Sequence, residues 1–209
     1  MFKAWRIVRI SLLILVVLFV ALVIYRIPAA EEKMKTEEAV NKIHAEKITL
    51  ADALGQNLPP EPDATLNNAT VEGIDANKNG IRDDVELAIF KLYPTSSRIR
   101  AAELQYAMAL QNELTNVFNS ETLVATIQEE GRSNLCIKNT IPPRVASDSS
   151  STIINNITLI SARANEVENL IFNTEMRKSK QKEIYQKYMT SYGSVEKEDC
   201  DTDLNSLPN

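Results

Sequence analysis

Residues 75–86 (DANKNGIRDDVE) form an acidic segment with the side chains best suited to chemistry in this chain. Side chains that carry oxygen stand at its positions one, three, five, nine and twelve: Asp75, Asn77, Asn79, Asp83 and Glu86. Short carboxylates and amides on alternate residues point inward when a chain wraps an ion. Six to eight such oxygens at about 2.3–2.6 Å suit Ca²⁺. The spacing therefore predicts a site for this divalent cation.

Two features of the backbone complete this predicted site. Gly80, at position six, permits a sharp turn because it has no Cβ atom. The carbonyl group of Ile81 can supply a further ligand, and Glu86 can reach back with both oxygens from the first turn of a following helix. The sequence leaves open whether Asp83 or Asp84 is the ligand. In an alternative interpretation, Asp83 caps that helix and Glu86 completes a capping box, but capping does not require the four earlier polar and glycine positions.

The segment resembles the EF-hand calcium loop, whose pattern D-x-[DN]-x-[DN]-G-x5-E it matches in full. It departs from that family because extended chain precedes it, Arg82 stands at the usually aliphatic eighth position, and the sequence holds no second copy. It is therefore more similar to dockerin and thrombospondin type 3 repeats, and GIDANKNGIRDDVE also resembles a segment of uncharacterised exported bacterial proteins. This resemblance implies calcium binding and an envelope location, and it implies no known activity. A lone loop is expected to bind Ca²⁺ with a Kd of about 10⁻⁴–10⁻³ M. Such a site would stabilise the fold.

The N-terminal segment predicts a membrane anchor. Residues 10–25 carry no charge, and residues 5–26 are long enough to span a bilayer, with Trp5 and Tyr25 at its two interfaces. A cleaved signal peptide is the alternative, although Arg26 and Ile27-Pro28 make a poor cleavage site. Basic residues precede the span, so residues 1–4 are expected in the cytoplasm and the body in the periplasm or outside the cell.

The two cysteines are expected to pair in an exported body. A Cys136–Cys200 disulfide would hold an acidic C-terminal tail, residues 194–209, against the body. Two free thiols are the alternative. A zinc site is not expected, because the single histidine, His44, lies far from both cysteines in the sequence. We expect His44 to be a surface residue.

Apolar residues at helical spacing predict an all-α fold of about four helices, with a stalk before it. Residues 27–62 are expected to form a polar stalk helix, over 30–53, and a Pro-rich linker. The helical domain is expected over 63–193, with helices near 85–93, 95–118 and 120–131. A long final helix, 147–192, would follow, with Gly193 as its C-cap.

Charge and composition narrow the function. The first 26 residues hold four basic residues and no acid, which leaves 23 − 4 = 19 basic against 28 acidic residues beyond them, a balance of −9. The body therefore gives no sign of nucleic-acid binding. We expect a non-enzymatic module that acts through an unidentified envelope or surface protein. The alternatives are a calcium-responsive sensor and a carboxylate-dependent hydrolase, for which the candidate acids are Glu72, Glu103, Glu129 and Glu130.

Overall fold

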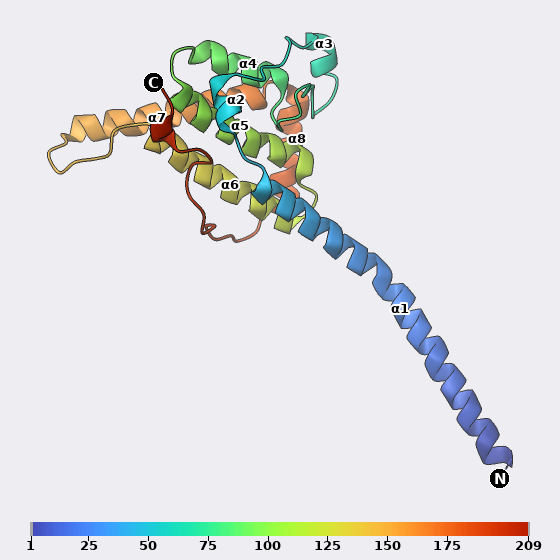
Figure 1. The fold of residues 1–209 in the computed structure, drawn as a ribbon. Coiled ribbons are helices and arrows are strands. Elements are labelled where there is room, and N and C mark those ends of the chain that lie inside the picture. The colour runs from blue at the N-terminus through green and yellow to red at the C-terminus, as the bar shows by residue number, and fades with distance from the viewer. Residues whose placement is uncertain (1, 209) are drawn as a thin grey trace. The chain divides into compact units, whose positions relative to one another are not determined.

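The computed structural model describes residues 2–208, whose regular elements are all helices, with no β-strand among them (Figure 1). This confirms the all-α prediction. The elements are α1 (Phe2–Ala45), α2 (Leu50–Leu54), α3 (Ala64–Asn67), α4 (Asp83–Leu92), α5 (Ser97–Asn116), α6 (Ser120–Asn139), α7 (Ser150–Ile171), α8 (Glu175–Tyr188) and the 3₁₀ turn η1 (Leu204–Ser206). Met1 of the expected cytoplasmic segment and Asn209 of the tail lie outside the described residues.

The N-terminal helix α1 is long and apolar enough to cross a membrane. Its large apolar side chains, such as Leu12 and Phe19, are exposed, as a lipid-facing helix requires. Pro28 lies inside α1 and does not end it, so the helix continues past the expected span without a break. The chain divides into one compact unit that ends at Ala39 and a second that begins at Val40.

The prediction of a single stalk helix over 30–53 is wrong, because the structure divides this segment between two helices. Residues 30–45 belong to α1, and α2 is a separate short helix that begins after Thr49 and ends before Gly55. Thr49 and Asp52 form a capping box, which fixes the new start. Ile43 and Ile48 are almost fully buried, so this part of the chain packs into the second unit. The unit therefore begins about twenty residues before the expected boundary at 62/63.

The central helix of the second unit is α5, which packs against α2, α4, α6, α7 and α8. Almost every side chain from Arg100 to Leu114 is buried, because neighbours cover α5 on all sides. Ser96 caps the start of α5 by accepting a hydrogen bond from the backbone N–H of Ile99 over 3.2 Å.

Helix α6 is longer than predicted, because Gly131 does not end it. The helix continues for two more turns, in which Arg132, Ser133, Cys136 and Ile137 are buried against the core. Packing of this face offsets the low helix propensity of one glycine, which costs about 1 kcal/mol relative to alanine.

The predicted helix over 147–192 is two helices, and its expected C-cap Gly193 lies beyond both. Helix α7 ends at Ile171, and Thr174 begins α8 by accepting a hydrogen bond from the backbone N–H of Arg177. The apolar stripe of α7 contacts the core only in its second half. Val167 is buried, whereas Ile157 is 59% exposed.

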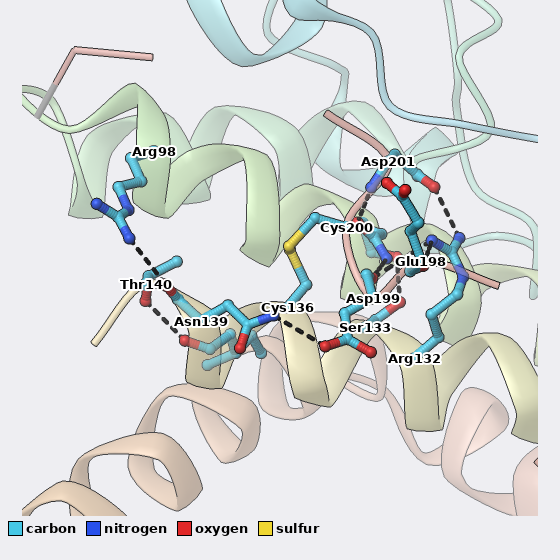
Figure 2. The surroundings of a disulfide bond; sticks show 12 residues. Arg98, Arg132, Ser133, Cys136, Asn139, Thr140, Glu198, Asp199, Cys200 and Asp201 are labelled. Carbon is cyan, nitrogen blue, oxygen red and sulfur yellow. Dashed lines mark hydrogen bonds and ion pairs between the residues drawn. A yellow bond between two sulfur atoms is a disulfide. The ribbon is translucent and has the colours of Figure 1, made fainter. Parts of the chain in front are cut away.

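The disulfide prediction is confirmed, since Cys136 and Cys200 are bonded across 64 residues of sequence (Figure 2). The bond holds the C-terminal segment against α6. On one side of it Asn139 donates to Asp199, and on the other Arg132 pairs with Asp201 over 2.7 Å. The tail is therefore a packed part of the second unit.

Candidate functional site

The acidic segment 75–86 consists of a loop, residues 75–82, and the first turn of α4. Ile81, Val85 and Ile89 are fully buried and anchor the end of the loop and the first turns of α4 in the core. The four-residue helix α3 and a turn precede the loop, in place of the long entering helix of an EF-hand. The segment is thus fixed at its C-terminal end by packing and leads straight into a stable helix.

Two side chains of the loop form hydrogen bonds with Glu86. The side-chain amides of Asn77 and Asn79 each donate a hydrogen bond of 3.0 Å to Oε2 of Glu86. The structure therefore brings together positions three, five and twelve of the loop. Glu86 itself is almost fully buried.

The first residue of the loop closes its tight turn. The two carboxylate oxygens of Asp75 accept hydrogen bonds from the backbone N–H groups of Asn79 and Gly80, over 3.2 and 3.0 Å. Gly80 has φ of 86°, and Lys78 has φ of 59°, so two left-handed residues make the turn. The glycine at position six is therefore required by the backbone.

Two oxygen acceptors inside the loop are buried and have no hydrogen-bond partner: Oδ2 of Asp83 and Oδ1 of Asn77. The other carboxylate oxygen of Asp83 accepts from the backbone N–H of Ala76 over 2.9 Å. Buried acceptors are rarely left unsatisfied in proteins. Both atoms belong to side chains that the sequence predicts as ligands.

Within residues 2–208, Asp84 of the loop pairs with Arg82, whereas Asp75, Asp83 and Glu86 form no ion pair. Burial raises the pKa of Asp83, and the charges of Asp75 and Asp84 add to this effect. Burial also raises the pKa of Glu86, with smaller contributions from the charges of Asp52 and Asp83, against hydrogen bonds from the two asparagines. A divalent cation would offset this charge.

The capping interpretation of the loop is wrong. The N-cap of α4 is Arg82, which makes no side-chain cap, and Asp83 is already the first helical residue. Asp84 turns away from the loop, where it pairs with Arg82 and accepts a hydrogen bond from Asn173 over 3.3 Å. Asp83, and not Asp84, therefore faces the other candidate ligands.

Two buried arginines, to which the sequence assigned no such role, position the loop. Arg82 is fully buried and donates to the carbonyl oxygens of Leu170 and Ile171 at the end of α7, over 2.6 and 3.2 Å. Arg177 is also fully buried and donates to the carbonyl oxygens of Asn67, Thr70 and Val71, which precede the loop.

The four glutamates named as candidate catalytic acids do not form a site together. Glu103 pairs with Arg163 over 2.6 Å, and Glu72 is exposed. Glu130 lies against Glu113, and burial raises its pKa well above the usual value, with the Glu113 charge adding to this.

Glu129 belongs to an ion-pair network that includes His44. Nδ1 of His44 lies 2.8 Å from Oε1 of Glu129, so this histidine, expected at the surface, is partly buried beside a carboxylate. Although burial raises the pKa of Glu129, hydrogen bonds from His44 and Arg132 and the charges of Arg132 and Lys197 outweigh it and lower the pKa. These groups join the end of α1 to α6 and the tail.

In the part of the chain that the structure describes, no three His, Cys, Asp or Glu side chains form a group that could hold a metal ion by themselves. A cation in the loop would therefore depend on the amide oxygens and the Ile81 carbonyl as well as on carboxylates. Comparison of the chain with known protein families, characterised proteins and solved structures finds no match.

Proposed function

We propose that this protein is a membrane-anchored, non-enzymatic helical module whose body lies outside the cytoplasm and is stabilised by one Ca²⁺ ion. The observation that carries the calcium assignment is the convergence of the loop on Glu86, beside two buried oxygen atoms without partners. Such oxygens are the ligands that Ca²⁺ selects.

The proposed ligands are the side chains of Asp75, Asn77, Asn79, Asp83 and Glu86 and the carbonyl group of Ile81. The ion would supply positive charge where burial and neighbouring carboxylates disfavour ionisation of Asp83 and Glu86. Rotation of an asparagine side chain by half a turn exchanges its amide nitrogen and oxygen, so Asn77 and Asn79 can act as ligands. The ion would then hold the loop to the first turn of α4.

Thermal unfolding of the full chain in detergent micelles tests this role. With a Kd of about 10⁻⁴–10⁻³ M, 10 mM CaCl₂ should stabilise the folded state by about 1.4 to 2.7 kcal/mol, which raises Tm by about 3 to 11 °C. Glu86→Gln should abolish this shift. Glu72→Gln, a change of the same kind at an exposed position beside the loop, should retain it. An equal shift in both variants would exclude the loop as the site.

The location rests on two features of the chain. Helix α1 is long and apolar enough to span a membrane, and a disulfide is typical of an oxidising compartment. The basic residues before the span favour a cytoplasmic N-terminus. Protease added to intact spheroplasts should therefore digest the body, and digestion only after lysis would place the body in the cytoplasm.

A further inference from the structure

The second unit has an apolar groove where the loop between α6 and α7 meets the first half of α7. Its volume is about 650 Å³. Six apolar residues line it: Ile141, Pro142, Pro143, Ile153, Ile157 and Ile160. Figure 1 shows this part of α7 and the preceding loop extending away from the other helices of the unit. The groove is distant in sequence from the calcium loop and shares no residue with it.

Three basic side chains border this groove: Arg98 at the start of α5, Lys138 near the end of α6, and Arg144 in the loop. None of the three forms an ion pair within residues 2–208. The guanidinium group of Arg98 donates to the carbonyl oxygen of Asn139 over 2.8 Å, and its Nε is buried without a partner among the described residues. The one acidic lining residue, Asp148, accepts a hydrogen bond from the backbone N–H of Val145.

This local charge is opposite to that of the rest of the body. Beyond the anchor the chain carries a balance of −9, from 19 basic and 28 acidic residues. Arginines elsewhere in the second unit, such as Arg82, Arg132 and Arg163, pair with carboxylates. An acidic ligand would gain from these three cations, which form no ion pair within residues 2–208.

We propose that the groove binds an acidic peptide segment of another protein, in which aliphatic side chains alternate with carboxylates. The cations lie on three separate elements with apolar surface between them. A ligand therefore needs negative charge at more than one position and apolar groups between these charges, which an extended peptide supplies. This inference specifies the partner of the proposed module, and it uses none of the calcium ligands.

The proposal can be tested with fluorescence anisotropy on the full chain in detergent micelles. The probe is a fluorescein-labelled peptide of alternating glutamate and leucine, and its competitor is the matching lysine–leucine peptide. The acidic peptide should bind saturably, and the affinity should fall as salt rises. The double variant Lys138→Glu/Arg144→Glu should weaken binding at least tenfold, because both side chains are exposed and make no intramolecular ion pair.

A matched pair of variants tests the apolar part. Ile157 is 59% exposed and lines the groove, whereas Ile154 is 62% exposed and does not line it. Ile157→Glu should abolish binding and Ile154→Glu should leave it unchanged, with equal circular dichroism spectra. Glu86→Gln should also bind normally, so loss of calcium binding and loss of peptide binding are separable.

Three results would overturn the proposal. The first is no saturable binding of the acidic peptide at millimolar concentration. The second is equal binding of the lysine–leucine peptide. The third is binding of the chain to anionic lipid vesicles that Ile157→Glu abolishes, without any binding of the peptide.

Discussion

The side-chain amide of Asn79 donates a hydrogen bond of 3.0 Å to Oε2 of Glu86. This bond joins the middle of the acidic loop to the first turn of α4, seven residues further along the chain. Glu86 therefore already lies at the centre of the loop, and a bound cation would find its twelfth-position ligand in place. A cation would replace this hydrogen bond once Asn79 turns its amide oxygen inward, and little of the backbone would need to be reordered because it already holds Glu86 near the loop.

Arg82 should be necessary for the stability of the loop. Arg82→Met keeps most of the buried volume but removes the donors to Leu170 and Ile171, and it leaves both carbonyl oxygens without that partner. We expect the free energy of unfolding to fall by about 2 to 4 kcal/mol. Urea denaturation measures this change. Lys91→Met, at an exposed position of the same helix, serves as the control, and equal stability of the two variants would contradict the role of Arg82.

Substitution by alanine should change the stability of the fold in opposite directions at two glycines. Gly73 has φ of 69°, and a Cβ atom there would collide with the side chain of Arg82, so Gly73→Ala should destabilise the fold by more than about 1 kcal/mol. Gly131 lies inside α6 with open space around its Cα atom, so Gly131→Ala should stabilise the fold by about 0.5 to 1 kcal/mol. Chemical denaturation measures both values. If both substitutions changed the free energy of unfolding in the same direction, the description of the surroundings of one of these glycines would be wrong.

Stability should fall as pH rises, because Glu113 is buried near other carboxyl groups. Burial raises its pKa to about 7 from an ordinary value of 4.5, and Glu168 adds to this. Between these two pH values the folded chain holds a proton that the unfolded chain has released, so each pH unit costs up to about 1.4 kcal/mol of stability. Glu113→Gln has no such proton and should show a flatter profile in urea denaturation at pH 5 and pH 8.

Glu121→Gln, at an exposed position of α6, is the control for that experiment and should keep the wild-type slope. Identical slopes for the wild type and Glu113→Gln would contradict the assignment of this pH dependence to Glu113.

The disulfide should contribute strongly to stability because it closes a long loop. For a separation of 64 residues the chain-entropy treatment gives about 4 kcal/mol. Cys136→Ser with Cys200→Ser should lose this amount, and reducing agent should destabilise the wild type but not the double variant. Thiol counting on denatured, unreduced chain should find no free thiol. Two free thiols in exported protein would contradict the bond.

The loop and the disulfide could be predicted from the sequence because each depends on few residues at recognisable positions. The loop pattern is local, and two cysteines allow only one intramolecular pair. The packing of Arg82 and Arg177 could not be predicted in this way. Their partners are backbone carbonyl groups about 90 and 110 residues distant in sequence, and no side-chain pattern marks a carbonyl group.

Helix boundaries were predicted less well than helix identity. The apolar stripe of α7 continues in step toward Tyr185, so periodicity alone could not reveal the break at Asn173. The hydrogen bond from the Arg177 N–H to Thr174 makes that break, and burial of the Arg177 guanidinium among the turns before the loop holds α8 in its own place. Tertiary contacts therefore decided where the helices end.

Calcium titration calorimetry on the full chain in detergent micelles tests the central claim most directly. We expect one ion per chain with a Kd of about 10⁻⁴–10⁻³ M. Asp83→Asn should abolish this binding because it removes charge from the buried carboxylate that faces the loop. Asp84→Asn should preserve it because that side chain turns toward Arg82. No heat of binding at 10 mM Ca²⁺, or equal effects of the two variants, would contradict the account.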